Sequence, residues 1–360
     1  MVDIPLRVSA APAFSNRKEN PYQWLLYRQL QSLGVEIDEF RLAHLLEGRH
    51  DVFHIHWVEQ YAISKRNLRT ALFRAASLLT AVDVGRRRGT RVVWTVHNLL
   101  PHERFHPQLQ RWVLGAFARR VDATIHMSET ARAAALAAYP ILRCAPAVVI
   151  PHGHYRDVYP HEASAAEARA RLAVSPSARV LLYFGQIRQY KNVPELLRAF
   201  SGLADQDVVL LVAGEPRTAE LGPAIETLAA NDARVRTSLR WIDDDQVQYY
   251  LKAASLVVLP YKEVLNSGAA HLALSFDRPV LVPDQGSLPD LQQQVGPEWV
   301  HLYRGPLTAD HLQAGLDWAL APRVAKARPP LIEWTEAAAD TLRLYQEVLG
   351  RRRLNRKPGC

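Results

Sequence analysis

The stretch from residue 259 to residue 291, LPYKEVLNSGAAHLALSFDRPVLVPDQGSLPDL, carries the pattern that decides the fold. It opens with the end of an apolar strand, continues through a polar turn, and starts a helix on Asn266-Ser267-Gly268. A second apolar strand, residues 279–282, follows that helix and ends in a turn that contains Gly, Ser and Pro. Strands that alternate with helices in this way are typical of parallel α/β domains.

The same alternation runs through the whole chain in two successive blocks. It predicts an α/β fold with two Rossmann-like domains that face a central cleft, and a C-terminal helix that packs back on the body. We expect the first domain at residues 1–160, the second at 161–330, and the closing helix with a basic tail at 331–360. The expected strands are 6–9, 52–55, 91–96, 123–126 and 147–150 in the first block, and 180–184, 208–213, 235–239, 256–259 and 279–282 in the second.

The composition is that of a folded protein with more than one domain. The chain has 360 residues, of which 48% are hydrophobic and 22% charged, and this length exceeds the usual size of one compact core. Neither a signal peptide nor a run of about 18 apolar residues is found, so we expect a cytoplasmic location. The net charge of +8 favours an anionic partner, such as nucleotide phosphates, anionic lipid or nucleic acid.

Two turns of the second block carry groups that suit a phosphate ligand. In FGQIRQYKN, residues 184–192, a strand ends on Gly185, and Arg188 and Lys191 stand at the mouth of the next helix, where two cations can hold a diphosphate. The helix that starts on Ser267 leaves free backbone N–H groups and the positive end of a dipole. The residues expected to bind this phosphate-bearing ligand are Gly185, Arg188, Lys191, Gly214, Glu263, Asn266, Ser267 and Gly268.

Histidines and carboxylates gather in the loops of the first block. HIHWVE (residues 54–59) and WTVHNLLPHE (94–103) each follow a strand directly, so their side chains are expected at one rim of the sheet. We consider three interpretations: a polar acceptor site in which one group takes a proton from a hydroxyl, a metal site, and loop-capping histidines without a functional role. The spacing is not that of a zinc site. The side chains concerned are those of His54, His56, Glu59, His97, Asn98, His102 and Glu103.

A further loop, PHGHYRDVY at residues 151–159, lies at the junction of the two blocks. Gly153 would allow the backbone to approach a ligand closely. His152, His154 and Arg156 offer hydrogen-bond donors to such a ligand. The alternative is a simple turn.

The ordered set of motifs resembles a known family. GQIRQYKN, LVAGEP, WIDDDQVQYYLKAASLVVLPY and RPVLVPDQGSLPDL are similar to the nucleotide-sugar domain of GT-B glycosyltransferases. FHIHWVE, HNLLPHE, PHGHYRDVY, LPYKEVLNSG, LALSFDRPVL and VGPEWVHLY resemble, more closely, the β-mannosyltransferases of xanthan and related exopolysaccharide synthesis. The resemblance covers residues 5–305.

The resemblance implies a hexosyltransferase that moves a sugar from a nucleotide diphosphate, GDP-mannose in the xanthan case, to a lipid-diphosphate-linked oligosaccharide at the cytoplasmic face of the membrane. It also implies inversion at the anomeric carbon. Arg188 and Lys191 would then hold the diphosphate, and Glu59 or Glu103 would be the base, with His97 assisting. The residues expected to contact the acceptor or line the cleft are His56, Asn98, His152, His154 and Arg156.

The chain departs from the retaining members of the GT-B group in two places. Those enzymes have two glutamates eight positions apart, whereas here Glu263 is followed by His271. They also usually have Arg directly after the glycine, where this chain has Gln186. No Asp-x-Asp metal motif lies in a suitable loop, because residues 243–245 fit a helix start. We therefore expect metal-independent transfer without a cofactor.

Several alternatives remain open on the sequence. Within the enzymes they are a retaining GT-B transferase and a UDP-sugar-dependent transferase, such as a glucuronosyl or glucosyl transferase. Outside them, the chain could be an inactive nucleotide-sugar-binding subunit of a polysaccharide assembly complex. A nucleic-acid partner is not expected, since aromatic residues are not interleaved with the basic clusters. The basic, amphipathic pattern at residues 65–88 suggests peripheral contact with an anionic membrane.

Overall fold

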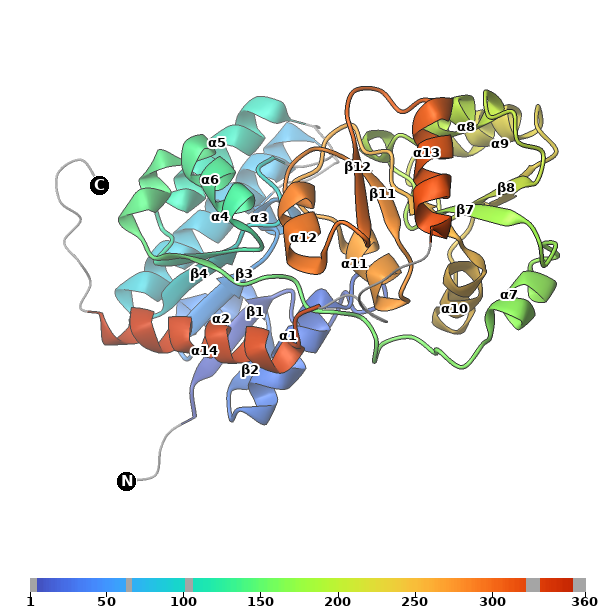
Figure 1. Ribbon diagram of the computed structural model, residues 1–360. Coiled ribbons are helices and arrows are strands. Elements are labelled where there is room, and N and C mark those ends of the chain that lie inside the picture. The colour runs from blue at the N-terminus through green and yellow to red at the C-terminus, as the bar shows by residue number, and fades with distance from the viewer. Residues whose placement is uncertain (1–4, 63–66, 101–105, 322–330, 352–360) are drawn as a thin grey trace. The chain divides into compact units, whose positions relative to one another are not determined.

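The computed structural model describes residues 5–62, 67–100, 106–321 and 331–351. The chain folds into two compact units (Figure 1). The first unit extends to Gly153 and takes up the chain again from Ile332. The second unit comprises His154–Leu331. The division therefore falls inside the loop at residues 151–159, and the C-terminal helix belongs to the first unit.

The first unit is built on a parallel sheet of six strands in the order β2-β1-β3-β4-β5-β6. Alternate residues of each strand point to opposite faces, and this separates two hydrophobic cores. Helices α1 and α14 cover one face, while α2, α4 and α5 cover the other. The strands are β1 (Arg7–Ala11), β2 (Glu36–Glu39), β3 (Val52–Ile55), β4 (Arg91–Thr95), β5 (Ala123–His126) and β6 (Ala147–Val149). The helices are α1 (Tyr22–Ser32), α2 (Leu42–Glu47), α3 (Val58–Ala62), α4 (Leu68–Arg87), α5 (Pro107–Ala118), α6 (Glu129–Ala138), η1 (Pro140–Cys144) and α14 (Trp334–Gly350).

The second unit repeats this plan with a parallel sheet in the order β12-β11-β10-β7-β8-β9. One hydrophobic core extends over both faces of this sheet. The strands are β7 (Arg179–Phe184), β8 (Val208–Ala213), β9 (Val235–Ser238), β10 (Leu256–Val258), β11 (Val280–Pro283) and β12 (Val300–Tyr303). The helices are α7 (Ala165–Arg171), η2 (Gln189–Lys191), α8 (Val193–Ser201), α9 (Leu221–Ala229), α10 (Asp244–Ala253), α11 (Gly268–Ser275), α12 (Leu288–Val295) and α13 (Ala309–Leu320).

The structure confirms the predicted α/β class and the ten expected strands, with shifts of one or two residues at some ends. It adds two strands that the sequence pattern did not predict, β2 and β12. Both lie at an edge of their sheet and pair with a single neighbour. The strand order reverses between β1 and β3 in the first sheet, and between β7 and β10 in the second. Loops at the carboxyl ends of such strands are where ligands bind in open α/β sheets.

The C-terminal helix α14 packs back on the body, as predicted, and the structure shows that it does so on the first sheet. Its residues Trp334, Leu344 and Tyr345 are buried in the same core as Tyr22 and Leu26 of α1. The two helices lie against one another (Figure 1). The last helix of the chain therefore completes the core that the first helix begins.

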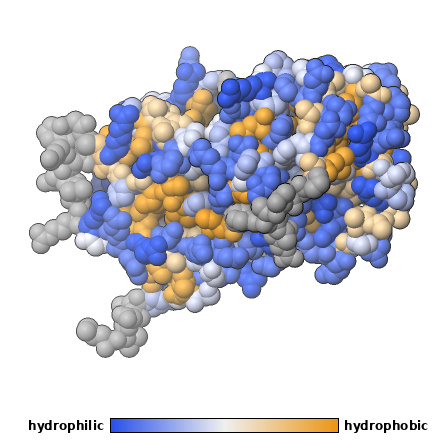
Figure 2. All heavy atoms as spheres, viewed as in Figure 1, coloured by the Kyte–Doolittle hydropathy of each residue, from blue (hydrophilic) through white to orange (hydrophobic). Residues whose placement is uncertain are grey.

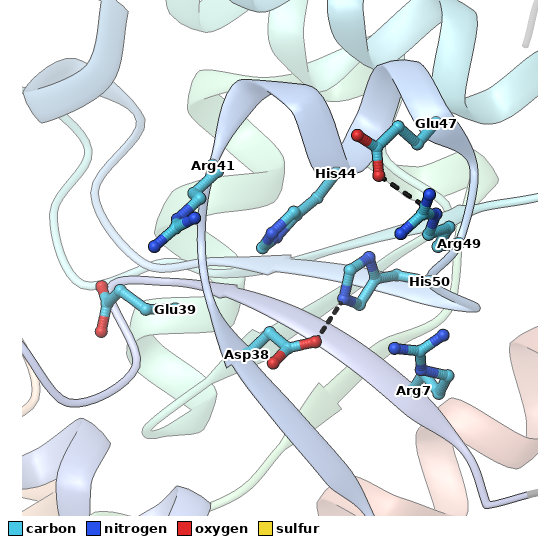
Figure 3. A pocket seen from close by; sticks show the side chains of 8 residues that line it. All are labelled: Arg7, Asp38, Glu39, Arg41, His44, Glu47, Arg49 and His50. Atoms are coloured by element: carbon cyan, nitrogen blue, oxygen red, sulfur yellow. Dashed lines mark hydrogen bonds and ion pairs between the residues drawn. The ribbon is translucent and has the colours of Figure 1, made fainter.

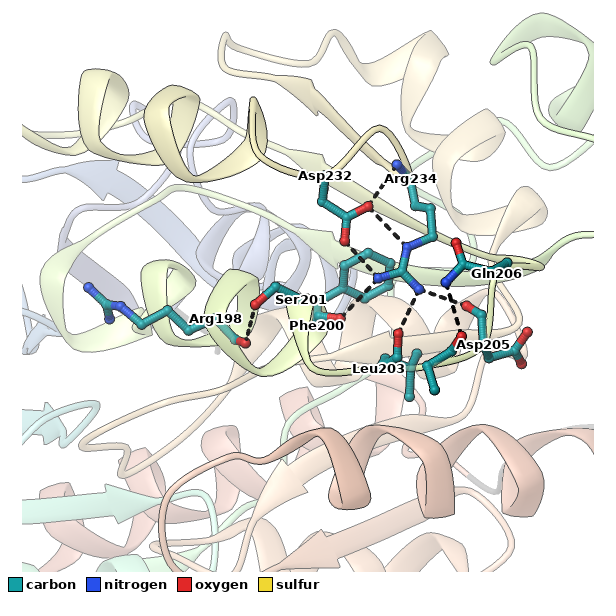
Figure 4. A network of polar contacts seen from close by, with 9 residues as sticks. Arg198, Phe200, Ser201, Leu203, Asp205, Gln206, Asp232 and Arg234 are labelled. Atoms are coloured by element: carbon teal, nitrogen blue, oxygen red, sulfur yellow. Dashed lines mark hydrogen bonds and ion pairs between the residues drawn. The ribbon is translucent and has the colours of Figure 1, made fainter.

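A half-buried arginine anchors the end of α8 in the second unit. Arg234 donates to the carbonyl oxygens of Leu203 at 2.8 Å and Asp205 at 2.7 Å, and it pairs with the carboxylate of Asp232 at 2.7 Å (Figure 4). Its guanidinium also stacks over the ring of Phe200, 4.7 Å from the centroid. The hydrogen bond from Arg234 lowers the pKa of Asp232, so the pair stays ionised. This cluster fastens the loop that leads into β8.

Candidate functional site

Two glycines of the second unit, Gly185 and Gly214, allow the backbones of two turns to contact each other at the carboxyl ends of β7 and β8. Gly214 has φ +149°, and a Cβ built on it would lie 2.0 Å from the carbonyl oxygen of Gly185. Gly185 itself has φ +122°. Any other residue at position 214 would collide with the neighbouring turn. The turns after β7 and β8 therefore lie in direct backbone contact at this edge of the sheet.

Lys191 lies beside that edge. Its Nζ would be 3.5 Å from a Cβ on Gly185, and burial together with the nearby charge of Arg188 lowers the pKa of Lys191 to about 8. Within the part of the chain that the structure describes, no carboxylate pairs with this ammonium group. A desolvated cation without a carboxylate partner is costly unless an anion neutralises it. The arrangement is therefore suited to hold an anionic group.

Arg188 stands at the start of η2 and is oriented by its own loop. The Nε and Nη2 atoms of Arg188 donate to Oε1 of Gln186 at 3.3 Å and 3.2 Å. Gln186 stands directly after Gly185, where the resemblance to the retaining enzymes leads us to expect arginine. Here the glutamine side chain orients the guanidinium that the chain supplies two residues later.

The turn after β10 meets the turn after β7. The backbone N–H of Lys262 donates to the carbonyl of Tyr190 at 2.8 Å, which joins the two loops at the point where the strand order reverses. Ser267 is the N-cap of α11: its Oγ accepts from the N–H of Ala270 at 3.2 Å and lies 2.9 Å from the hydroxyl of Tyr261. The predicted helix start is thus confirmed. Its free N–H groups and the dipole favour an anion at this end.

Glu263 and His271 occupy the two positions at which the retaining enzymes have glutamates. Glu263 lies exposed in the loop between β10 and α11. His271 is buried on α11, and burial lowers its pKa to about 4. Its Nδ1–H donates to the carbonyl of Ser267 at 3.0 Å. His271 is thus a neutral residue that fastens the first turn of the helix, and it carries no carboxylate chemistry.

In the first unit, a chain of hydrogen bonds joins Tyr27, His56 and His97. The hydroxyl of Tyr27 lies 2.7 Å from Nε2 of His56, and Nδ1 of His56 lies 2.9 Å from Nε2 of His97. Burial lowers the pKa of His97 to about 3 and that of His56 well below its usual value. Both imidazoles are therefore neutral, and each nitrogen of His56 is already engaged. His56 can position His97, but it has no nitrogen left for an acceptor.

A second chain lies beneath the first. Nδ1 of His54 is 2.6 Å from the hydroxyl of Tyr345, and Nε2 of His54 is 2.7 Å from Oγ1 of Thr95. Burial, followed by the proximity of His97, lowers the pKa of His54 to about 3. His54 is thus a satisfied core residue, which is the structural interpretation considered for the histidines. Trp57 stacks on the ring of His97 with the ring centroids 4.5 Å apart.

Glu59 stands in the first turn of α3, shortly after β3. Its surroundings desolvate the carboxyl group and raise the pKa of Glu59 to about 7, against a smaller opposing effect of a backbone hydrogen bond. A carboxyl group with a pKa near neutrality can both take and release a proton at physiological pH. Glu103, the other predicted base, and His102 lie outside the described residues.

The remaining predicted contacts fall in different places. Asn98 follows β4 beside His97. His152 is buried in the first unit, where its ring meets Tyr22 edge-on with the centroids 5.0 Å apart. His154 and Arg156 belong to the second unit, where Arg156 pairs with Asp277 at 3.6 Å. The loop at residues 151–159 is therefore shared between both units.

Sequence reasoning missed the aromatic residues that hold these histidines. Tyr22 and Tyr27 come from α1, and Trp334 and Tyr345 from α14. Their apolar faces mark them as core residues in the sequence. Only their positions in the fold reveal that their hydroxyl groups and rings orient the histidines.

A polar cavity of about 380 Å³ lies between β1, β2 and α2 of the first unit (Figure 3). Its charged groups largely pair with one another. His50 Nε2 donates to Asp38 at 2.8 Å, and Arg49 pairs with Glu47 at 3.2 Å. Glu39 accepts from the backbone N–H groups of residues 13–15. This internal neutralisation sets the cavity apart from the ammonium group of Lys191, which no carboxylate of the described residues neutralises.

Neither a metal site nor a membrane span is found in the described part of the chain. No group of three or more His, Cys, Asp or Glu side chains in it could hold a metal ion. None of its helices has the length and apolarity needed to cross a bilayer.

Comparisons with known proteins identify the family to which the chain belongs. The family model described as "Glycosyl transferases group 1" matches residues 178–302. The GDP-mannose:glycolipid 4-beta-D-mannosyltransferase of Xanthomonas campestris pv. campestris is 33% identical over 354 residues, which cover 96% of this chain and 95% of that enzyme.

Solved structures share the fold. Sucrose-phosphate synthase from Thermosynechococcus elongatus superposes with a TM-score of 0.69 at 17% identity and covers 96% of this chain and 99% of its own. HepE from Anabaena, in complex with UDP and glucose, has a TM-score of 0.63 at 13% identity, with coverage of 96% and 98%. The chain belongs to the group 1 glycosyltransferases and has the GT-B fold.

Proposed function

We propose that this glycosyltransferase moves mannose from GDP-mannose to a lipid-linked glycan, with inversion at the anomeric carbon. The relative that supports this proposal spans both units and is named for a GDP-mannose donor and a glycolipid acceptor. The single observation in the structure that carries it is the desolvated ammonium group of Lys191 beside Gly185, with no carboxylate partner among the described residues. An ammonium group in that environment calls for a ligand with concentrated negative charge, such as a diphosphate.

We assign the donor diphosphate to the switch point of the second sheet. Lys191 and Arg188 would offset the charge that develops on the diphosphate as it leaves. The N–H groups at the start of α11 would add donors from Gly268 onward. These groups do the work that a metal ion does in other transferases, so we propose metal-independent transfer without a cofactor.

We assign the acceptor to the first unit, with Glu59 as the base. A hydroxyl group attacks the anomeric carbon as its proton passes to a carboxylate, while the C–O bond to the diphosphate breaks on the opposite face of the sugar. Glu59 has the pKa that this task requires. Neutral His97, held by His56, would hydrogen-bond the acceptor. Glu103 is the competing base, outside the described residues.

The retaining alternative finds less support in this chain. It would need a second carboxylate at position 271, where a buried neutral histidine hydrogen-bonds to Ser267. An acceptor of the proposed kind is made at a membrane, so we place the enzyme in exopolysaccharide or cell-surface glycan synthesis, at the inner face of the cytoplasmic membrane.

A binding panel followed by a transfer assay tests the proposal. Thermal shifts are measured with GDP, UDP, dTDP and ADP and with their sugars, on the wild type and on Lys191→Ala, because a ligand of the folded state raises the melting temperature. We expect stabilisation by GDP and GDP-mannose that is lost in the variant. The matched control is Lys252→Ala, which removes a lysine from the last turn of α10 at the opposite edge of the sheet.

The transfer assay uses GDP-mannose labelled at the anomeric carbon and a lipid-linked oligosaccharide, and NMR identifies the anomer of the product. A β-linked product supports inversion, and an α-linked product overturns it. Selective stabilisation by UDP-sugars would show that the donor is a UDP-sugar and not GDP-mannose. Binding without transfer to any acceptor would favour the inactive-subunit alternative.

A further inference from the structure

Three polar side chains lie buried along one face of helix α11 and its N-cap. Ser267, His271 and Ser275 follow one another at intervals of four residues, which places them on the same face of the helix. Hydrophilic residues (blue) cover much of the molecular face seen in Figure 2, where solvent can satisfy their hydrogen bonds. The three side chains of α11 are buried instead, so each needs a partner within the protein.

A chain of hydrogen bonds joins these side chains and ends on the backbone of Tyr155. Nδ1–H of His271 donates to the carbonyl of Ser267 at 3.0 Å, and Oγ of Ser275 donates to the carbonyl of His271 at 2.6 Å. The same Oγ of Ser275 accepts from the backbone N–H of Tyr155 at 2.8 Å. The segment that contains Tyr155 is therefore fastened to the last residue of α11.

The side chain of Tyr155 extends from that point back to the start of α11. Its backbone N–H meets Ser275 at the end of the helix, whereas its hydroxyl oxygen would lie 3.4 Å from a Cβ on Gly268, the first residue. Arg156 holds the same segment through an ion pair with Asp277 at 3.6 Å. The ring of Tyr155 is itself buried. These contacts fix the place of the hydroxyl before any ligand binds.

The start of α11 belongs to the diphosphate site that we assign to the donor. The ring of Tyr261 lies 6.3 Å from that of Tyr190, the neighbour of Lys191 in the chain, and the hydroxyl of Tyr261 lies 2.9 Å from Oγ of the N-cap residue. Gly268 is only half-buried, so solvent reaches the first turn of the helix. The hydroxyl of Tyr155 therefore stands at the end of α11 where the helix dipole favours an anion.

We propose that the hydroxyl of Tyr155 donates a hydrogen bond to the β-phosphate of the donor. When the bond between the anomeric carbon and the β-phosphate oxygen breaks, the electron pair stays on that oxygen, and the hydrogen bond strengthens as the negative charge grows. No proton leaves Tyr155 in this step. The inference rests on the proposed function and deepens it, because it names a further residue that contacts the leaving group. Sequence reasoning selected His152, His154 and Arg156 from this loop and passed over Tyr155.

Calorimetric titrations of the full-length chain with GDP and with GMP test the inference. GMP lacks the β-phosphate, so its binding depends only on the rest of the nucleotide site. Tyr155→Phe removes the hydroxyl and keeps the ring. We expect this variant to bind GDP roughly tenfold more weakly, with wild-type affinity for GMP and a wild-type melting temperature. The matched control is Tyr303→Phe, in which a tyrosine of similar burial on the edge strand β12 loses its hydroxyl. It should bind both nucleotides as the wild type does.

A second variant tests the anchor of Tyr155. Ser275→Ala removes the hydroxyl that accepts from the N–H of Tyr155, and it should also weaken GDP binding, because Tyr155 is then held less firmly. If Ser275 acts through Tyr155, the double variant should bind GDP no more weakly than Tyr155→Phe alone. Additive losses in the double variant would show that Ser275 does not act through Tyr155.

Three outcomes overturn the inference and leave the proposed function standing. The first is wild-type affinity for GDP in Tyr155→Phe. The second is an equal loss for GDP and GMP, which would give the hydroxyl a purely structural role. The third is a loss confined to GDP-mannose, which would assign the hydroxyl to the sugar. A wild type that binds no nucleoside diphosphate overturns both proposals. If the wild type prefers UDP, the same comparison is decided with UDP and UMP.

Discussion

The hydroxyl of Tyr345 lies 2.6 Å from Nδ1 of His54, although 291 residues separate the two in the sequence. Tyr345 belongs to the C-terminal helix and His54 to the central strand β3. Both side chains are fully buried. The helix therefore supports the strand that leads to His56 and Glu59, and with them the proposed acceptor site.

This contact predicts a stability effect. Replacing Tyr345 by Phe leaves one nitrogen of the buried His54 without its partner, and should lower the free energy of unfolding by about 1–2 kcal/mol. Urea unfolding followed by circular dichroism measures it. The control is Tyr22→Phe in the same core, because no hydrogen bond of the Tyr22 hydroxyl is found within the described residues. An equal loss in both variants would contradict the assignment.

Lys191 should lower the stability of the ligand-free protein, although it promotes binding of the diphosphate. Its pKa of about 8 lies below the ordinary lysine value of 10.5. Holding the charged form in the folded protein therefore costs free energy. Below pH 8 the Lys191→Met variant should therefore be more stable than the wild type by roughly 1–3 kcal/mol. Stability of the wild type should rise between pH 8 and pH 10.5, where the unfolded state binds more protons, and the variant should lack this rise.

The same lysine sets a pH dependence for the nucleotide. Deprotonation of Lys191 removes the charge that attracts the diphosphate, so the affinity for GDP should fall as the pH rises above about 8. Calorimetric titrations at several pH values measure the affinity. An affinity for GDP that is unchanged in Lys191→Met at pH 7 would place the diphosphate elsewhere.

The pH dependence of kcat/KM should follow the pKa of Glu59. A base must be ionised, so kcat/KM should rise with pH through about 7 and level off above it. Glu59→Gln should lower kcat by about 10²–10⁴ without changing GDP binding. The folded state holds the proton more tightly than the unfolded state, so wild-type stability should fall between pH 4.5 and 7. In Glu59→Gln this fall should be absent.

Glu103→Gln is the comparison for that experiment. The two variants are assayed side by side with the same acceptor. A large loss of kcat in Glu103→Gln with near wild-type activity in Glu59→Gln would transfer the role of base to Glu103.

Gly214 should tolerate no side chain. A Cβ would lie 2.0 Å from the carbonyl oxygen of Gly185, at a φ of +149° that other residues rarely adopt. Gly214→Ala should therefore cost about 2–4 kcal/mol in stability and abolish the thermal shift with GDP. The control is Gly222→Ala in the first turn of α9, where a Cβ meets only Pro216 at 3.8 Å. That variant should be neutral or more stable by up to about 1 kcal/mol.

The central strands could be predicted because their signal is local. The bounds of β3, β5 and β8 are those predicted, since a strand covered on both faces is mainly apolar and stands out in the sequence. β2 reads EIDE and pairs only with β1. An edge strand of this kind gains most of its stability from its neighbour. Its four residues alone therefore do not predict a strand.

The candidate site also has features that the sequence could predict and others that only the fold reveals. Residue type and position after a strand were enough to predict that Gly185, Arg188, Lys191 and Ser267 lie at the carboxyl ends of the strands, because parallel strands gather such turns at one edge. The sequence alone could not separate the role of His97, which follows β4, from that of His54, which lies within β3. His54 is held by Tyr345 and Thr95, and His97 by His56, which Tyr27 holds in turn.

The amino-acid sequence by itself determined the alternation of strands and helices, the glycine turns and the family of this protein, because these depend on neighbouring residues and on motif order. Only the tertiary structure decided which side chains are desolvated and which are paired. Burial sets the pKa values of Glu59 and Lys191, and a hydrogen bond joins Tyr345 to His54. Both effects come from groups distant in sequence, because burial and hydrogen bonding depend on what the fold places around each group.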